Sequence, residues 1–204
     1  MGRLGHIQAN MTYQRTTAQF MADKAKGQKA ESTFMSLISL MGGTAYAIGT
    51  VPGKADATPR FSRPAPDKEN GFCFSVAPDI LFSLPDRPRG FSALAQIKVK
   101  KLMRGNSKTC PHILLDEKEL HRMKGAHSFH DVFFVIHLPE FSDVPDVPDW
   151  AYVTVEELIH TELIKRTIRD KPAFLIPFSL FRPLSEISKG TPYEAANTNT
   201  APTS

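Results

Sequence analysis

The sequence predicts an α/β protein with a central mixed β-sheet flanked by helices. Three observations lead to this fold class. Apolar residues recur with a helical period over residues 27–42, and the stretch 72–101 has the character of two β-strands joined by a tight turn. The nearly continuous apolar run DVFFVIHL at 131–138 is typical of a central strand. Helical and strand-like segments alternate along the chain, as expected when helices pack on a mixed sheet.

Length and composition are those of an ordinary globular protein. The chain has 204 residues, enough for one domain with a real core, and 41% of them are hydrophobic. We expect an N-terminal extension over 1–25, a single domain over 26–185 and a disordered tail over 186–204. The formal net charge of +4 is compatible with a polyanionic partner but does not require one.

Cysteine usage and hydropathy indicate the compartment. The two cysteines, Cys73 and Cys110, are too few for a secreted disulfide framework, so reduced thiols in a cytoplasm are the default. The N-terminus has no apolar run, and the longest apolar stretches are too short and too interrupted to span a bilayer. A cytoplasmic protein with no membrane association is therefore expected.

The segment 27–42 is the clearest helix, and a short helix around 14–24 is a second candidate. The apolar stripe of the helix at 27–42 includes Phe34 and Ile38, and Gly42-Gly43 ends that helix. Extending the stripe back by three residues from Phe34 reaches Glu31, which places a carboxylate on the inward side of the helix. A buried carboxylate is costly unless it is paired or binds a metal. The alternative is that Glu31 lies at the exposed end of the stripe and interacts with the helix dipole.

The predicted hairpin carries the most informative residues. A strand over 71–84 should bend at Pro78, because proline cannot donate to a β-ladder, and Asp79 follows it directly. After a turn at 85–90, a strand over 91–102 alternates polar and apolar residues. Gln96, Lys98 and Lys100 would share one face of that strand and face a cleft, while Ala95, Ile97 and Val99 would pack into the core.

The remaining elements are expected to complete the sheet and its helical layers. They are a first strand at 44–51, a polar, proline-rich loop at 52–70, a loop at 104–111, a charged helix at 116–124, a strand at 150–154, a helix at 155–165 and an edge strand at 173–177.

The order of these motifs resembles the PD-(D/E)xK, or restriction-endonuclease-like, nuclease fold. In that family a helix bearing a Glu precedes a strand with Pro-Asp, a tight turn and a strand with an acid or amide, one residue, then Lys. Lys26-Gly27, Glu31 and Gly42-Gly43 are similar to the opening of the archaeal Holliday-junction-resolvase type. The Gln-x-Lys version also resembles a branch found in bacterial, mobile-element and defence-associated proteins, in which a strand containing Trp, here Trp150, leads into a helix.

The resemblance implies a site for Mg²⁺ or Mn²⁺ that hydrolyses phosphodiester bonds. Asp79 would be the central metal ligand, and Glu31 would bind the metal or hold a metal-bound water. Gln96 would occupy the second acidic position and could offer its side-chain oxygen, and the backbone carbonyl of Ile97 would be a further ligand. Lys98 would orient the attacking water or stabilise developing charge.

DNA is the partner that the resemblance implies, in a defence, mobile-element or repair context. Lys100, Lys101 and Arg104 directly follow the predicted site and could contact phosphates beside it, or could form a solubilising strand end. A homodimer is the family-level expectation, because cleavage of a duplex often needs two sites.

Gln96 also motivates an alternative from a different class. An amide supplies no negative charge and cannot act as a base, so a site with two carboxylates should bind a metal less tightly than one with three. The chain could therefore be a non-catalytic nucleic-acid-binding or protein-interaction module that retains the nuclease fold. Taken singly, Asp79 could be an ordinary turn residue, and Gln96 and Lys98 could be the solvated face of an edge strand.

Overall fold

The computed structural model describes residues 16–48, 78–85, 92–102, 111–141, 147–168 and 170–189. The loop expected at 52–70, much of the strand expected at 71–84, most of the turn at 85–90, and Arg104 lie outside these residues. Within the described residues, no helix combines the length and the apolar character that crossing a membrane requires.

The first element is one long helix, α1, which spans Thr17–Leu40. The sequence predicted two separate helices here, and the structure shows that Gly27 does not interrupt the run. Thr16 caps the helix through a capping box with Gln19. This motif marks the start of α1, where the apolar periodicity is too weak to indicate it. Gly42, with φ of 79°, adopts the left-handed conformation just past the end of the helix.

The main sheet has the strand order β1-β2-β3-β5-β6-β9. Only β3 and β5 run parallel, and the other neighbours pair antiparallel, so the sheet is mixed as predicted. The strands are β1 (Thr44–Ala47), β2 (Ile80–Ser83), β3 (Ala93–Val99), β5 (Asp131–His137), β6 (Trp150–Thr154) and β9 (Arg182–Pro183).

A second, three-stranded antiparallel sheet has the order β4-β8-β7. Its strands are β4 (His112–Asp116), β7 (Ile164–Ile168) and β8 (Lys171–Pro177). β8 is therefore the central strand of a small sheet and not the edge strand that was expected. The helix expected over 155–165 also ends early, and β7 takes its last residues, because the backbone at Thr161 is extended and its hydroxyl donates to the carbonyl of Glu157.

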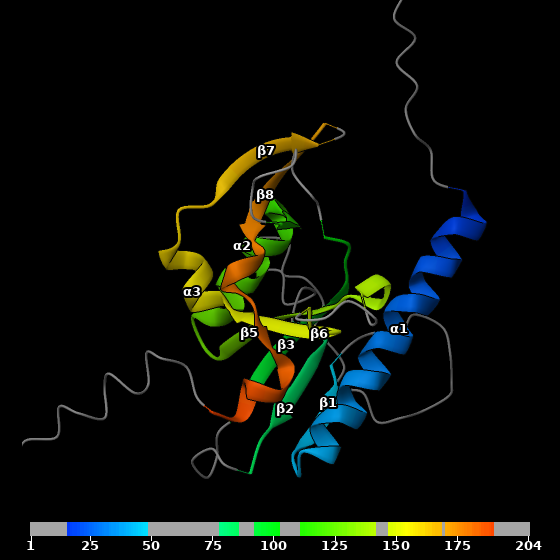
Figure 1. Cartoon of the computed structure of the whole chain (residues 1–204), viewed down its shortest axis with the longest axis vertical. Coiled ribbons are helices and arrows are strands. Elements are labelled where there is room, and N and C mark those ends of the chain that lie inside the picture. Colours follow the sequence, from blue (N-terminus) through cyan, green and yellow to red (C-terminus); the bar gives the residue numbers. More distant parts are fainter. Residues whose placement is uncertain are drawn as a thin grey trace, which may run out of the picture.

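Helices cover both faces of the main sheet (Figure 1). On one face α1 buries Ala30, Phe34 and Ile38 against β2 and β3. The opposite face is covered by α2 (Glu117–His127), α3 (Val155–His160) and the small sheet. β3 and β5 are thus enclosed on both faces, which explains the apolar run that marked β5 as central. Short 3-10 helices complete the described chain at Pro139–Phe141, Phe178–Leu180 and Leu184–Lys189.

The junction between α1 and β1 depends on Gly43. A Cβ atom added there would lie 2.3 Å from the carbonyl oxygen of Ser83 and 2.9 Å from Cγ2 of Ile38. No side chain fits in this space without moving backbone, so glycine lets the end of α1 pack directly on the end of β2. This contact fixes the helix relative to the hairpin.

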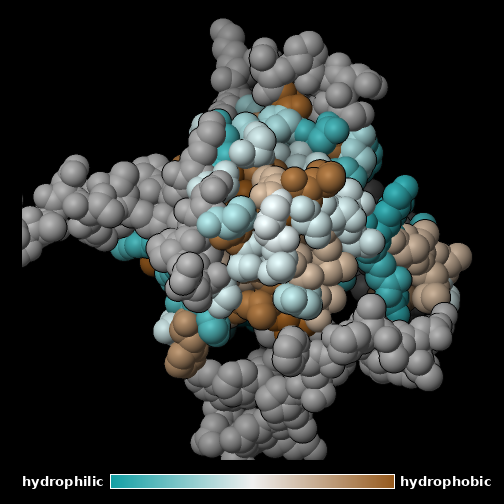
Figure 2. Space-filling view, turned by 90° about the horizontal axis from the view of Figure 1, so that it is seen from below, coloured by the Kyte–Doolittle hydropathy of each residue, from teal (hydrophilic) through white to brown (hydrophobic). Residues whose placement is uncertain are grey.

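Large exposed apolar side chains are scattered over the described surface. They are Phe20, Met21, Leu40, Tyr46, Phe129, Ile159 and Ile164. In the view from below, apolar side chains appear as separate brown areas between pale and teal ones (Figure 2). Scattered apolar residues of this kind are normal on a protein surface and do not by themselves mark an interface.

Candidate functional site

β2 and β3 separate at Pro78. Their antiparallel register pairs Ile80 with Ala95, so continuing it by two residues places Pro78 opposite Ile97. Proline has no N–H, and it therefore cannot donate to the Ile97 carbonyl as the next ladder residue would. The carbonyl of Asp79 faces the other neighbour, as the alternation along a strand requires, and accepts from the N–H of Ile48 at 2.8 Å, which continues the register of β1 with β2. The Pro-Asp pair thus ends one ladder and opens a fork between β2 and β3.

The side chain of Asp79 fills this fork. Its Oδ2 accepts a hydrogen bond from the backbone N–H of Ile97 at 3.0 Å and another from the Gln96 amide nitrogen. The N–H and C=O of one strand residue point to the same edge, so the Ile97 carbonyl also points into the fork. The structure therefore brings together the Asp79 carboxylate, the Gln96 amide and the Ile97 carbonyl.

Gln96 is buried, with 8% of its surface exposed, and its partner explains how the burial is tolerated. The amide nitrogen donates to Asp79, so a buried donor is satisfied by a charged acceptor. The face of β3 that was expected to line an open cleft is instead covered at this position. Gln96 presents its nitrogen to Asp79, and its oxygen would reach a cation bound there only after rotation of the amide.

Lys98 lies two residues further along the same face of β3. Its Nζ is 2.9 Å from Oε1 of Glu119, a residue of α2, and the two side chains are 37% and 17% exposed. Burial alone would lower the pKa of Lys98, but the charges of Glu119, Asp79 and Glu31 outweigh it and raise that pKa above its ordinary value. Lys98 is therefore a firmly charged ammonium, suited to donating hydrogen bonds and not to accepting a proton.

Glu31 reaches this neighbourhood from the other layer of the molecule. It follows the buried Ala30 on α1 and is itself half-buried. Its charge acts on Lys98 together with that of Asp79, although less strongly than that of Glu119. The charges of two carboxylates, one on α1 and one beside β2, thus act on one ammonium, and Glu119 of α2 adds a third that contacts it.

Glu119 is the residue that sequence reasoning missed. The segment 116–124 was recognised as a charged helix, yet none of its acids was assigned to the site. The available signal is its spacing: Glu119 lies one turn before Met123, which is 1% exposed, so it is on the inward edge of α2.

The predicted phosphate-contacting lysines have protein partners in the structure. Lys100 donates from Nζ to the carbonyl of Leu114 at 2.8 Å and so connects β3 with β4. Burial lowers the pKa of Lys100, with Lys98 acting in the same direction and Glu119 opposing. Lys101 forms an ion pair with Glu140 at the surface.

The donor types at the fork are those that a hard divalent cation prefers. Asp79 offers a carboxylate and Ile97 a backbone carbonyl, and both are oxygen ligands suited to Mg²⁺ or Mn²⁺. Among the described residues, no three His, Cys, Asp or Glu side chains gather closely enough to hold a metal ion. A cation held by the Asp79 carboxylate and the Ile97 carbonyl alone would keep several of its waters, as protein-bound Mg²⁺ usually does.

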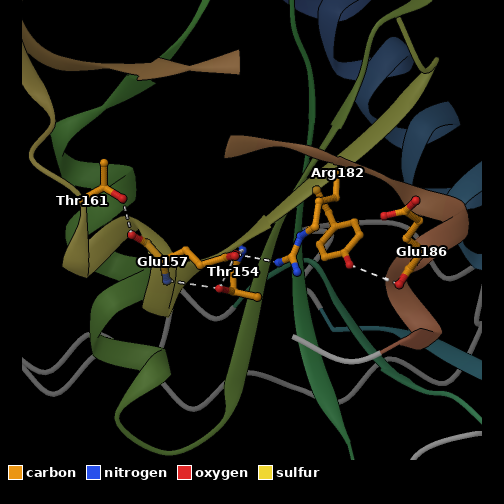
Figure 3. Close-up of polar contacts among 6 residues, drawn as sticks. Thr154, Glu157, Thr161, Arg182 and Glu186 are labelled. Carbon is orange, nitrogen blue, oxygen red and sulfur yellow. Dashed lines mark hydrogen bonds and ion pairs between the residues drawn. The ribbon is translucent and has the colours of Figure 1, made fainter. Parts of the chain in front are cut away.

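A second polar cluster lies at the opposite edge of the main sheet, around Glu157 (Figure 3). Its Oε2 accepts from the N–H and hydroxyl of Thr154 and from Nη2 of Arg182 at 2.7 Å. The Arg182 guanidinium lies over the ring of Tyr152, whose hydroxyl donates to the carbonyl of Glu186. These contacts cap α3 and hold β9 and the last 3-10 helix on β6, so the cluster is structural.

Two solved structures illustrate what the chain is similar to. The chain is 16% identical to the Holliday junction resolvase Hjc of the archaeon Archaeoglobus fulgidus, with a TM-score of 0.46, over 81% of this chain and 98% of that one. It is 13% identical to D212, a nuclease from a fusselovirus, with a TM-score of 0.46, over 86% of this chain and 92% of that one. No protein-family model and no curated protein sequence matches the chain.

Proposed function

We propose that the protein is a metal-dependent nuclease that hydrolyses phosphodiester bonds in DNA through a restriction-endonuclease-like site. One observation carries the proposal: the Asp79 carboxylate is held in the fork between β2 and β3, beside the Ile97 backbone and on the same strand face as the charged Lys98. In the PD-(D/E)xK pattern, Gln96 takes the second acidic position.

The charge balance of the site supports a requirement for a cation. Three carboxylates, Glu31, Asp79 and Glu119, act on the single ammonium of Lys98. Lys100 is nearby, but its charge is disfavoured by burial and its Nζ is already bound to a carbonyl. An excess of negative charge repels a phosphate, so a divalent cation is needed before a polyanion can occupy the site.

The residues then have separate roles. Asp79 and the Ile97 carbonyl would hold Mg²⁺ or Mn²⁺, with Glu31 supporting a bound water and Gln96 able to add its oxygen. The cation would neutralise charge on the phosphate and lower the pKa of a bound water. Lys98 would donate to a phosphate oxygen or to the attacking water, and Glu119 would hold its ammonium in place.

The same proposal covers the wider context. Lys100, Lys101 and Arg104 would lie near the phosphates that flank the scissile bond, with Lys101 exchanging its ion pair with Glu140 for a phosphate. Two copies would act together on the two strands of a duplex, in the cytoplasm, in a defence, mobile-element or repair process.

Cleavage assays with a matched pair of variants test this function. The purified protein is incubated with plasmid, linear duplex and branched DNA in Mg²⁺, in Mn²⁺ and in EDTA. Asp79→Asn should abolish cleavage, whereas Asp131→Asn, at an exposed position at the far end of β5, should leave it unchanged. Equal activity of wild type and Asp79→Asn, or no cleavage of any substrate, would refute the proposal.

A non-catalytic binding module is the second candidate, and the hydrogen bond from Gln96 to Asp79 favours it. In this arrangement the Gln96 amide donates a hydrogen bond to the Asp79 carboxylate, which therefore has a partner without any cation. Calorimetric titration with Mn²⁺ separates the two candidates. A nuclease site should give heat that disappears in Asp79→Asn, and a module without a metal site should give none.

A further inference from the structure

The solvent-exposed side of α2 carries no acid. The two acids of this helix are half-buried and pair with other elements: Glu117 with Lys165 of β7, and Glu119 with Lys98 of β3. The residues that are exposed are all Lys, Arg, His or Gly, and together they form the exposed side of α2. They are Lys118, His121, Arg122, Lys124 and Gly125.

The stability of α2 does not explain these cations. In the part of the chain that the structure describes, the side chains of Lys118 and Arg122 form no ion pair. Lys118 lies in the first turn, where a cation opposes the helix dipole, and it is four residues from Arg122, a spacing at which like charges repel. Glu119 precedes Arg122 by three residues, but its carboxylate contacts Lys98. The two cations are therefore available to another molecule.

The exposed side of α2 adjoins the candidate site. Glu119 contacts Lys98, and Arg122 follows Glu119 by three residues, so the two are neighbours on the helix surface. Burial lowers the pKa of Lys100, and the charge of Asp116, the N-cap of α2, opposes this from nearby. The first turns of α2 thus lie beside the strand that carries the site lysine.

The site and its neighbour differ in sign of charge. Within the site, the carboxylates Glu31, Asp79 and Glu119 outnumber the ammonium of Lys98. The five residues of the exposed side of α2 have a formal charge of +3, from two lysines and one arginine with histidine neutral. Attraction for a polyanion must come from a surface beside the site, and this surface has the required charge.

We infer that a DNA duplex arm next to the scissile bond lies against the exposed side of α2, with its phosphates on Arg122 and Lys118. Closely spaced phosphates suit two long cationic side chains with no acid between them on the surface. Gly125 continues the same stripe, and a Cβ added there would meet no described atom within 4 Å, so the DNA backbone can pass close to the helix. This inference rests on the proposed function. A second copy of the chain would bring like charges together and is a poorer occupant.

Two double variants with the same change of charge test the inference. Lys118→Gln/Arg122→Gln removes two cations from α2 while keeping similar helix propensity. Arg166→Gln/Lys171→Gln is the control, because it removes one Arg and one Lys from exposed positions of the β7–β8 pair. Binding of a labelled duplex is measured by fluorescence anisotropy in Ca²⁺, which takes the same oxygen ligands as Mg²⁺.

The α2 variant should raise Kd about tenfold and reduce the slope of log K against log salt concentration by about two. The control should stay within about twofold of wild type in Kd, with an unchanged slope. Arg122→Lys keeps the charge and should keep the slope of wild type. Equal losses in the α2 variant and the control would mean that only net charge matters, and would overturn the inference.

The rate of cleavage separates a binding role from a structural one. At saturating DNA the single-turnover rate of the α2 variant should stay within about twofold of wild type, because Lys98 and Glu119 are unchanged. Its temperature of unfolding should not fall, since the repulsion between Lys118 and Arg122 is removed. A slower reaction at saturation, or a less stable fold, would assign these residues to the scaffold of the site and refute the contact.

The outcomes also distinguish this inference from the function on which it rests. If wild type binds and cleaves no DNA, both fail together. If wild type cleaves DNA but Lys118→Gln/Arg122→Gln binds as wild type does, only the α2 contact is wrong.

Discussion

The ammonium of Lys98 and the carboxylate of Glu119, 2.9 Å apart, connect the central strand β3 with helix α2 across the face that also carries Asp79. Lys98 thereby has a protein partner even without a substrate. Its side chain is 37% exposed, so this partner restricts the ammonium without removing it from solvent. The pair places a charged donor beside the fork before any phosphate arrives.

Glu119→Gln should lower the cleavage rate about tenfold, because the Lys98 ammonium loses the charge that orients it. Glu117→Gln is the matched control, since Glu117 also pairs with a lysine, Lys165, but at an exposed position on the small sheet. Single-turnover rates measured at saturating DNA would show the effect. Equal rates for the two variants would remove Glu119 from the proposed machinery.

Gln96→Glu should make stability depend on a divalent ion. The new carboxylate would meet Asp79 where the amide now donates, and in EDTA the repulsion should cost roughly 1–3 kcal/mol. Mn²⁺ should reverse the loss and raise Tm more than it does for wild type. Gln96→Met removes the hydrogen bond without adding charge and serves as control; a Tm response to Mn²⁺ no larger in Gln96→Glu than in this control would speak against a cation at the fork.

Glu157→Ala should reduce the free energy of unfolding by about 2 kcal/mol, because it removes the carboxylate that accepts from the Thr154 N–H and hydroxyl in the capping box of α3 and that pairs with Arg182. The pair is 20% and 25% exposed, so the full cost of a buried unpaired charge does not apply. Urea denaturation would measure the loss. Glu156→Ala, in the same first turn of α3, should cost only a few tenths of a kcal/mol. Neither change should alter cleavage by the folded protein at permissive temperature.

His137 should make stability rise with pH just below neutrality. Burial lowers its pKa, with Lys29 acting in the same direction and Asp149 opposing, and its ring stacks on Trp150 at 4.4 Å. Below the ordinary histidine pKa of about 6.5 the unfolded chain then binds more protons than the folded one. The free energy of unfolding should therefore fall as pH drops through that region and level off above it.

His137→Gln should remove this part of the pH dependence. Urea denaturation of the two proteins between about pH 5 and pH 8 would show it as a difference that grows toward acid. Parallel curves for wild type and variant would mean that His137 titrates equally in the folded and unfolded states.

The hairpin and the central strand could be predicted from the sequence because each is marked by residues that are close together in the chain. The apolar run of β5 and the Pro78-Asp79 bend need no knowledge of distant residues. The register that places Asp79 opposite Gln96 is different, because it depends on how β2 and β3 pair after their connection. The sequence also left the orientation of the Gln96 amide open, and that orientation is set by its contact with Asp79.

The small sheet was missed for the opposite reason. β4 is only five residues long, and it pairs with β8 about sixty residues later, so no local sequence pattern predicts this strand or its pairing. The same sheet ended α3 early, because residues with helical character up to Lys165 were taken into β7. The spacing of Glu119 indicates that it faces inward, but only the packing of α2 against β3 shows that it meets Lys98.

Among the residues that the structure describes, α1 has its buried side chains only in its C-terminal half. Its C-terminal half is fixed by Gly43 and by the buried stripe from Ala30 to Ile38, while its first three turns extend beyond the sheet. In a rod held this way, a force on the free end produces its largest bending moment where the support begins. That position is Ala30, directly before Glu31, so mechanical load on the projecting helix would be felt first next to the carboxylate whose charge acts on Lys98.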